Sequence, residues 1–414
     1  MADQSSRLLN VRAVMDQLQT SGPLSRAELA RRCRLSKQTV SEVVAQLEAA
    51  GWLRATGESV IGGAGRSAAL YEVDPASGLV VGVDLGGTKI RAALGDFGGA
   101  VLREQTVATD PRGGHVVIDQ IAELARGLAQ AEGLDVGRVA CLALGSPGAL
   151  DRRTGVMAFA PNIPSFGDLD VAAELGARLG GVTTVVENDV NVSALGEQWA
   201  GHGRGLQDFV VIAVGTGIGM GIVVGGELRT GATGAAGEIG YMPIGADPFD
   251  PANRAKGPLE MATGGEALAR RYVALQGTAA AGPVAGDRHL VPAVFDGAAR
   301  GDWPAIAALH DEARVLALAI SAVAAVLDPE LVVLGGGIGA REELLRPVRS
   351  VLAQLMARPV EVRASALGDR AGLLGAVAVA LRTAQEQLFA APAPIGITVP
   401  APDLDRLSAG RLPV

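Results

Sequence analysis

The chain of 414 residues is poor in cysteine and in aromatic residues, and it has no long uninterrupted apolar segment. Its two cysteines, Cys33 and Cys141, are too few for a disulfide framework or a cysteine-based metal cluster, so we expect two buried thiols. The longest apolar run, residues 315–327, has 13 residues and includes Ser321, whereas a membrane-spanning helix needs ~20. Because no charged-then-apolar leader opens the chain, we expect a cytoplasmic protein without membrane contact.

What the chain does contain is typical of a globular α/β protein. Hydrophobic residues make up 49% of the sequence and charged residues 19%, a balance that allows a sizeable core. The 57 glycines, together with many alanines and valines, favour an α/β fold with numerous tight turns. This length exceeds what one hydrophobic core usually supports, and we therefore predict two or three domains.

The net charge of −8 is distributed unevenly along the chain. Residues 1–75 contain nine Lys/Arg and eight Asp/Glu, whereas the remainder contains 27 and 36. An acidic body is repelled by nucleic acid, so any contact with nucleic acid should involve the first 75 residues. There, Arg31, Arg32, Arg34 and Lys37 fall within seven residues. Such a cluster is usually a solvated face, so its meaning depends on the element that carries it.

Residues 7–51 show the periodicity of three short helices. Ser25 and Glu28 have the spacing of a capping box at the start of the second helix. Ser36 is the expected N-cap of the third helix, which Gly51 ends. The inward positions of the first and third helices are Leu8, Val11, Met15, Leu18, Val40, Val43, Val44 and Leu47.

The segments "WLRA" and "AALYEV" after Gly51 predict two strands joined by a glycine-rich hairpin. Two helices joined by a short turn occur in many proteins that never meet DNA, but here a basic cluster and a hairpin accompany them. The segment resembles the winged helix-turn-helix of bacterial repressors, which implies a recognition helix in the DNA major groove and usually a dimer on a two-part site. The candidate DNA-binding residues are Arg31, Arg32, Arg34, Ser36, Lys37, Gln38, Thr39, Ser41 and Arg66.

The segment "LVVGVDLGGTKIRAALGDFGG" (79–99) predicts two strands joined by a glycine turn that follows an acid. In such a turn, backbone N–H groups can approach a phosphate, and the acid can sit behind a hydrated magnesium ion. An ordinary Gly-Gly hairpin is the alternative on these residues alone. The segment "VVIAVGTGIGMGIVVGGEL" (210–228) repeats the pattern, which predicts two lobes related by approximate duplication. The candidate nucleotide-binding residues are Asp84, Gly86, Gly87, Thr88, Lys89, Thr216 and Gly217.

Seven motifs occur in the order seen in one known family: "VDLGGTK", "GSPG", "PNIP", "ENDVN", "GTGIG", "GAAGEIG" and "DPELVVLGGG". Over residues 79 to about 385 the chain resembles the ROK family of repressors and sugar kinases. The resemblance implies an actin- and hexokinase-like fold of two α/β lobes around a cleft. A winged head on such a body is similar to the xylose- and N-acetylglucosamine-responsive repressors, which bind operator DNA as oligomers and change affinity when sugar enters the cleft.

By position, the resemblance implies sugar hydrogen bonds from Asn162, Asn188 and Glu260, and a contact near the anomeric end from Glu238. It also implies that Asp189 occupies the place of the kinases' catalytic base. Carboxylates and amides suit a ring of hydroxyls because each forms several hydrogen bonds.

One motif departs from the family, which typically has GExGH followed by a cysteine-rich loop that binds zinc. Here Tyr241 replaces the histidine, and residues 242–260 contain no cysteine, so we expect no zinc or other structural metal. The loop must then be ordered by its prolines, by packing or by the ligand. Tyr241 remains a candidate sugar contact through its hydroxyl, but it cannot replace an imidazole that a metal orients.

Together these patterns predict an α/β chain with a winged helix-turn-helix (1–75), an N-terminal lobe (76–200), a C-terminal lobe (201–387) whose last helices return to the first, and a flexible tail (388–414). The predicted function is a sugar-responsive transcription regulator, a repressor of carbohydrate use, that requires no cofactor and whose effector is a small sugar or sugar phosphate. The alternative is an ATP- and magnesium-dependent sugar kinase, or a regulator that retains this activity. Xylose, glucose and N-acetylglucosamine types of sugar all remain open, as do dimer and tetramer.

Overall fold

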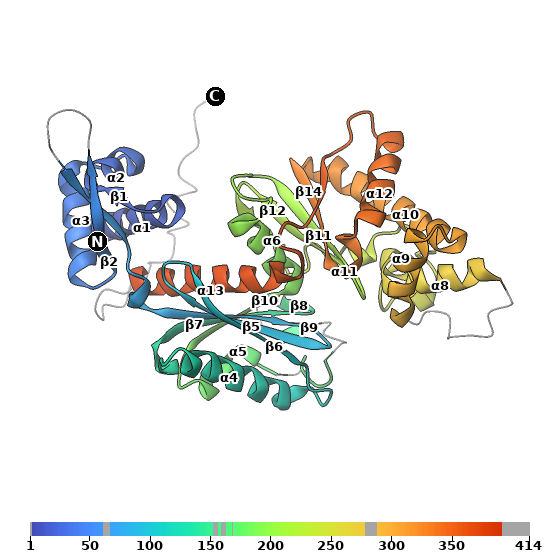
Figure 1. The fold of residues 1–414 in the computed structure, drawn as a ribbon, viewed down its shortest axis with the longest axis horizontal. Helices are drawn as coiled ribbons and strands as arrows, with labels where there is room; N and C mark the ends of the chain where they lie inside the picture. The colour runs from blue at the N-terminus through green and yellow to red at the C-terminus, as the bar shows by residue number, and fades with distance from the viewer. Residues whose placement is uncertain are drawn as a thin grey trace, which may run out of the picture.

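The structure is a computed structural model that describes residues 2–60, 67–151, 156–158, 163–167, 169–277 and 288–390. In it a small N-terminal head lies beside two α/β lobes, as Figure 1 shows. This arrangement confirms the predicted α/β class with its helical head and two lobes. In the described ranges, no helix combines the length and apolar character that crossing a membrane requires.

The head has the predicted three helices and wing strands. Ser25 accepts a hydrogen bond from the Glu28 N–H (3.2 Å) and Ser36 from the Thr39 N–H (3.0 Å), so both predicted N-caps are confirmed. The strands pair in the order β1-β3-β2. The elements are α1 (Ala2–Ser21), β1 (Leu24–Ser25), α2 (Arg26–Cys33), α3 (Lys37–Ala49), β2 (Leu53–Val60) and β3 (Ser67–Val73).

The N-lobe is built on a mixed sheet with strand order β10-β7-β4-β5-β6. Helices α4 and α5 pack on one face of it, where the described side chains form a continuous apolar core. The elements are β4 (Leu79–Leu85), β5 (Lys89–Asp96), β6 (Val101–Ala108), α4 (Gly114–Ala131), β7 (Val139–Ser146), β8 (Ala149–Asp151), β9 (Val156–Ala158), α5 (Val171–Arg178), β10 (Thr183–Asn188) and α6 (Asp189–Ala200).

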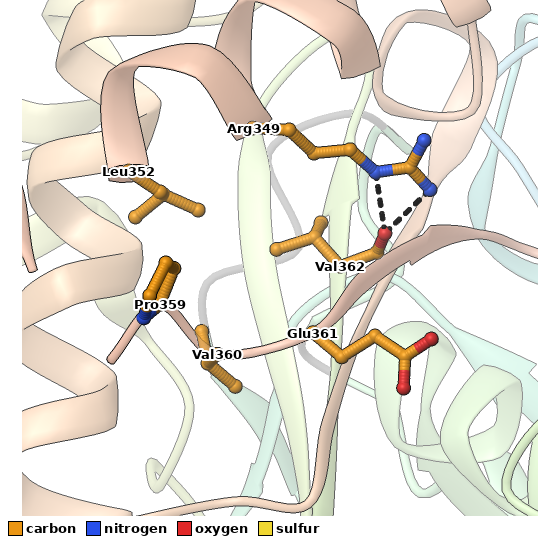
Figure 2. A pocket seen from close by; sticks show the side chains of 6 residues that line it. All are labelled: Arg349, Leu352, Pro359, Val360, Glu361 and Val362. Atoms are coloured by element: carbon orange, nitrogen blue, oxygen red, sulfur yellow. Dashed lines mark hydrogen bonds between the residues drawn. The ribbon is translucent and has the colours of Figure 1, made fainter. Parts of the chain in front are cut away.

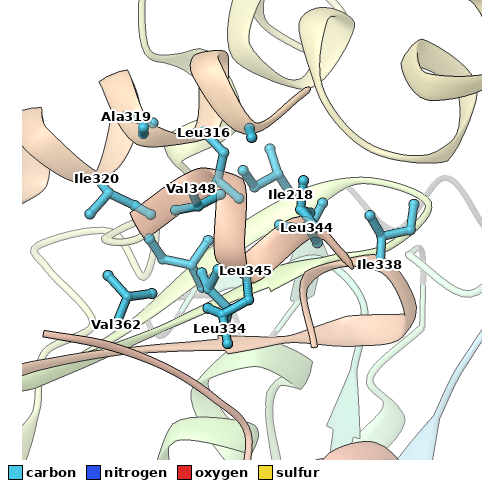
Figure 3. Packing of buried hydrophobic residues seen from close by; sticks show 14 of the residues in the cluster. Ile218, Leu316, Ala319, Ile320, Leu334, Ile338, Leu344, Leu345, Val348 and Val362 are labelled. Atoms are coloured by element: carbon cyan, nitrogen blue, oxygen red, sulfur yellow. The ribbon is translucent and has the colours of Figure 1, made fainter. Parts of the chain in front are cut away.

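The C-lobe has a second sheet with strand order β13-β12-β11-β14-β15. Its core lies between this sheet and two long helices, where Ile218 of β12, Leu316 of α10 and Leu345 of α12 meet (Figure 3). The elements are β11 (Phe209–Val214), β12 (Ile218–Val224), β13 (Glu227–Leu228), α7 (Pro258–Ala262), α8 (Gly265–Gln276), α9 (Val291–Ala299), α10 (Trp303–Leu327), β14 (Leu331–Gly335), α11 (Gly336–Gly339), α12 (Glu342–Leu355) and β15 (Val362–Ala364).

The two sheets share one topology. In the N-lobe, β4 pairs antiparallel with β5 and parallel with β7. In the C-lobe, β11 pairs antiparallel with β12 and parallel with β14. The predicted glycine hairpins therefore occupy equivalent places in the two lobes, as an approximate duplication requires.

The last helix, α13 (Ala371–Ala390), lies on the N-lobe sheet and crosses α6. The crossing depends on glycine, because a Cβ at Gly375 would lie 1.6 Å from the Val192 carbonyl oxygen and one at Gly196 would lie 2.2 Å from the Ala371 carbonyl oxygen. The helix continues to Ala390, three residues into the segment predicted as a flexible tail, and residues 391–414 lie outside the described part.

The head packs against the N-lobe and α13 rather than standing apart from them. The Trp52 ring stacks on Phe97, with centroids 5.6 Å apart. Arg12 of α1 forms a 3.5 Å ion pair with Glu386 near the end of α13. Buried side chains of the head and of the sheet face under α13 form one continuous cluster. In Figure 1, α13 accordingly extends along the N-lobe sheet to a position beneath the head.

Candidate functional site

Three of the predicted acids come together where the lobes meet. Asp189 is the first residue of α6, directly after β10. Burial and, after it, the negative charges of Asp84 and Glu238 raise the pKa of Asp189 to about 7, although the hydrogen bond from the Val190 N–H lowers it. Asp84 belongs to the N-lobe and Glu238 to the C-lobe, so both lobes contribute charge to one site. A carboxyl group with such a pKa can accept or donate a proton near neutral pH.

The predicted sugar ligand Asn188 has a structural role beside Asp189. Its Oδ1 accepts hydrogen bonds from the N–H groups of Val190 (2.9 Å) and Asn191 (3.0 Å), and its Nδ2 donates to the Gly148 carbonyl (2.9 Å). These bonds cap α6 and hold it to the "GSPG" segment. Asn188 therefore fixes the position of Asp189, a role that the sequence patterns did not reveal.

Glu260 lies against the second glycine hairpin. Its Oε2 accepts a hydrogen bond from the Ile218 N–H (3.2 Å), and a Cβ at Gly217 would lie 2.5 Å from the same oxygen. Burial raises the pKa of Glu260, and the charge of Glu238 contributes to this. The structure thus places a predicted sugar contact beside Thr216 and Gly217, the predicted phosphate-facing turn.

The first glycine hairpin is closed by its own hydrogen bonds. The Gly86 N–H donates to the Lys89 carbonyl (2.9 Å), and the Thr109 hydroxyl donates to the Gly86 carbonyl (2.7 Å). Gly87 and Thr88 are exposed at the tip. The Gly86 amide is therefore committed to the turn, and the exposed tip is the part open to a ligand.

Arg91 is a site residue that the sequence patterns did not single out. It lies directly opposite Asp84 in the β4–β5 register, and its Nη1 is 3.6 Å from the Asp84 carboxylate. Its guanidinium also donates to the carbonyl and carboxylate of Asp369, just before α13. An arginine inside the otherwise buried run "IRAALG" was the available signal, because a charge there needs a partner.

The loop that replaces the family's cysteine-rich segment is ordered by its own polar groups. Tyr241 is 45% exposed, and its hydroxyl donates to the Ala255 carbonyl (3.1 Å). Asn253 is buried, donates from Nδ2 to the Asp247 carbonyl (2.7 Å) and accepts from the Gly257 N–H at its own carbonyl (2.7 Å). Within the described ranges, no group of three or more His, Cys, Asp or Glu has the arrangement of a metal site.

Two predicted residues, Asn162 and Arg66, lie outside the part of the chain that the structure describes.

A surface pocket of about 310 Å³ lies between α12 and β15, where Arg349 donates twice to the Val362 carbonyl (2.9 and 2.7 Å; Figure 2). None of the predicted sugar or nucleotide residues lines this pocket. Its arginine is already satisfied by backbone, so we assign the pocket no role.

The described candidate DNA-binding residues divide into three groups: arginines held by Glu28, exposed cations without an ion pair, and polar residues at the start of α3. Glu28 does not complete the capping box with its side chain, because its carboxylate binds Arg31 (2.5 Å) and Arg32 (2.7 Å) instead. Arg34 and Lys37 are exposed and form no ion pair within the described ranges. The other predicted residues are Ser36, which caps α3, Gln38, which donates to Glu42, and the half-buried Thr39 and Ser41.

Arg34 and Lys37 stand at the start of the predicted recognition helix. Arg34 follows α2 in a left-handed conformation (φ 54°) that turns the chain toward α3. Lys37 is the first residue of α3. The N-terminal end of such a helix enters the major groove first, where cations contact phosphates.

Two family models match the chain. The ROK family model matches residues 80–383, and the MarR family model matches residues 9–59. Among curated proteins, a glucokinase of Thermotoga maritima is 34% identical over 318 residues, covering 72% of this chain and 96% of its own. A putative xylose repressor of a Caldicellulosiruptor species is 28% identical and covers 91% of this chain and 96% of its own.

Solved structures show the same two kinds of likeness. A ROK family glucokinase from Streptomyces griseus, in complex with glucose and AMPPNP, aligns with a TM-score of 0.62 at 31% identity, over 74% of this chain and all of its own. A ROK family transcriptional regulator, homologous to the Escherichia coli Mlc protein, aligns with a TM-score of 0.76 over 93% of this chain and 98% of its own. At 22% identity the second likeness concerns the fold. With a family model that spans both lobes and 34% identity to a glucokinase over 318 residues, the chain belongs to the ROK family.

Proposed function

We propose that this protein is a sugar-responsive DNA-binding transcription regulator, with the effector bound at the Asp189 site and the DNA at α3. The observation that carries the proposal is the direct packing of the DNA-binding head on the body, through Arg12 and Glu386 of α13 and through the stack of Trp52 on Phe97 of the N-lobe. A kinase has no need of such a head. The similarity to a putative xylose repressor over nearly the whole chain supports this function.

The effector class follows from the chemistry of the site. Asp189 and Glu238 supply carboxylates, and the family resemblance implies amide contacts to sugar hydroxyls from Asn188 and Asn162. Glu260 extends the set from the second hairpin. A neutral polyhydroxylated ring fits such a set because each hydroxyl can donate to an acid and accept from an amide. Xylose, glucose and N-acetylglucosamine remain the sugars to test.

The proposed signal passes from α6 to α13 and then to the head. Asp189 begins α6, and α6 crosses α13 at Gly196 and Gly375 with almost no space between the backbones. A shift of α6 on sugar binding must therefore move α13, whose Glu386 holds α1. In a dimer, a small tilt of both heads spoils the half-site spacing of about 34–36 Å. Complete switching requires the sugar to favour one state by about 5.5 kcal/mol.

A second function has one observation in its favour. The pKa of Asp189 near 7 suits a general base for a sugar hydroxyl, and glucokinases are among the relatives. We rank an ATP-dependent sugar kinase below the regulator because the exposed cations Arg34 and Lys37 of the head have no use in phosphoryl transfer. In the regulator, no cofactor is required, ATP and magnesium are dispensable, and Tyr241 leaves zinc no histidine ligand at that position.

The deciding experiment measures operator binding with and without sugars. Purified protein is bound to a DNA duplex selected from random sequences, and each candidate sugar is titrated while fluorescence anisotropy is followed. We expect one sugar to change the affinity, and Asp189→Asn to bind DNA normally but to lose this response. The exposed Asp311→Asn is the matched control and should respond like the wild type. If no sugar alters DNA binding, whereas magnesium-ATP and sugar yield rapid phosphorylation, the kinase is the correct function.

A further inference from the structure

The carboxylate predicted to stand behind magnesium already has a cation of the protein beside it. Asp84 is paired across the hairpin with Arg91, and the two side chains lie 3.6 Å apart. The Arg91 side chain is only 12% exposed, so solvent screens this charge weakly. Lys89 places a second positive charge nearby, because its Nζ lies 3.9 Å from the carboxylate of Asp369.

The guanidinium is held in place from two sides. Asp84 faces it from β4, and Asp369 binds it through both its carbonyl and its carboxylate. The Asp84 oxygens also lie against α13, because a Cβ at Gly372 would be 3.0 Å from Oδ1. Burial raises the pKa of Asp84, whereas Arg91 and Lys89 lower it. A hydrated magnesium ion binds through open carboxylate oxygens. The Asp84 side chain is only 22% exposed and already faces a fixed guanidinium, so magnesium would have to enter against that positive charge.

We propose that Arg91 takes the place of the divalent cation at the first hairpin, so that the site holds its effector without magnesium-nucleotide. This inference rests on the proposed function and sharpens it. An arginine is part of the chain, so it cannot be released with product or exchanged as a metal ion can. Arg91 is a specificity-determining residue here, since its charge excludes the metal on which phosphoryl transfer depends.

The test measures whether magnesium assists nucleotide binding. A non-hydrolysable ATP analogue is titrated by calorimetry into the full chain with and without magnesium chloride, and the ratio of the two affinities is compared between variants. In the wild type we expect a ratio below about five, and in Arg91→Ala a ratio at least about fivefold higher, because a unit charge within 4 Å is removed. Arg91→Lys keeps the charge and should behave like the wild type.

The controls separate a local effect from a general one. Arg103→Ala removes an arginine of β6 that pairs with Glu132, and it should leave the ratio unchanged. Arg91→Gln repeats the test if Arg91→Ala does not fold. A wild-type ratio above about five would overturn the proposal. So would folded Arg91 variants that keep the wild-type ratio or that bind no nucleotide at all.

The same preparations keep this inference distinct from the proposed function. Operator binding with and without sugar is measured on each. If Arg91→Ala gains magnesium dependence but the wild type shows no sugar response, the role of Arg91 is supported and the proposed regulatory function is rejected. A normal sugar response with no gain of magnesium dependence retains the regulator and removes the role of Arg91.

Discussion

Replacing Asp189 by asparagine should stabilise the sugar-free protein at alkaline pH. Asparagine keeps the oxygen that accepts the Val190 N–H but cannot ionise. Burial and the charges of Asp84 and Glu238 raise the pKa of Asp189 from 3.8 to about 7, so the native state prefers the protonated form. In the unfolded chain the same carboxyl group ionises near its ordinary pKa. The native state therefore binds more protons, and stability falls as pH rises from about 4 to about 7.

The size of the effect follows from this difference. One pKa unit corresponds to ~1.4 kcal/mol, so the fully ionised carboxylate weakens the fold by up to about 4 kcal/mol. Part of this loss has already occurred at pH 5, where the unfolded chain is ionised. Between pH 5 and pH 8 the variant should gain roughly 2.5 kcal/mol on the wild type, and less to the extent that water reaches the half-buried group.

Thermal unfolding of both proteins from pH 5 to pH 8.5, without sugar, measures this gain. The melting temperature of Asp189→Asn should exceed that of the wild type increasingly toward high pH. Asp311→Asn changes an exposed acid on α10 and should track the wild type throughout. If the wild type and Asp189→Asn lose stability in parallel over this range, Asp189 ionises without cost and the electrostatic argument for the site fails.

Three further predictions concern the head, the helix crossing and the loop. Arg34→Ala and Lys37→Ala should each weaken operator binding and reduce its logarithmic salt slope by about 1. Arg31→Ala should change both quantities less, because Glu28 already binds the Arg31 guanidinium. Equal effects of the three variants in anisotropy titrations over a salt series would contradict the assignment of Arg34 and Lys37 as DNA contacts. Gly375→Ala should lower the melting temperature sharply, because the added methyl group collides with the Val192 carbonyl. The control Gly127→Ala on α4, where nothing lies within 4 Å of the added methyl group, should stabilise the fold by about 0.4–1 kcal/mol. Similar shifts in the two variants would mean that α6 and α13 can separate freely. Asn253→Ala should remove the hydrogen bond to the Asp247 carbonyl, at about 0.5–1.5 kcal/mol, and speed hydrogen exchange across residues 242–257, with the exposed Gln354→Ala as control. Unchanged exchange would show that prolines alone order the loop.

The head could be predicted from sequence because its determinants are local. An N-cap such as Ser36 contacts a backbone N–H three residues on, and the inward valines of α3 follow from the helical period. The error concerned Glu28, for which two local partners compete. The capping box predicts that the Glu28 side chain turns back toward the start of the helix. Instead it binds Arg31 and Arg32, three and four residues ahead, because charged donors form the stronger hydrogen bonds.

The site could be predicted only in part because its pairs span the whole chain. The glycine hairpins were visible, since their turns demand glycine within a few residues. Arg91 and Asp369 are 278 positions apart, and no short-range pattern connects them. The role of Gly375 was equally hidden, because glycine in a helix normally signals weakness, and only the crossing with α6 explains it.

Charge balance at the Asp189 site connects effector binding to pH. Burial, the charges of Asp84 and Glu238 and local backbone hydrogen bonds set the pKa of Asp189, and no cation of the described residues is among these causes. A sugar hydroxyl that donates to Asp189 stabilises the ionised carboxylate, so binding must release a proton wherever the free site is protonated. Sugar affinity should therefore rise with pH up to about 7 and then level off, whereas the weakened sugar binding of Asp189→Asn should show no such dependence. A buried acid without a nearby cation thus serves a sensor well, because the ligand itself supplies the hydrogen bonds that make its charge tolerable.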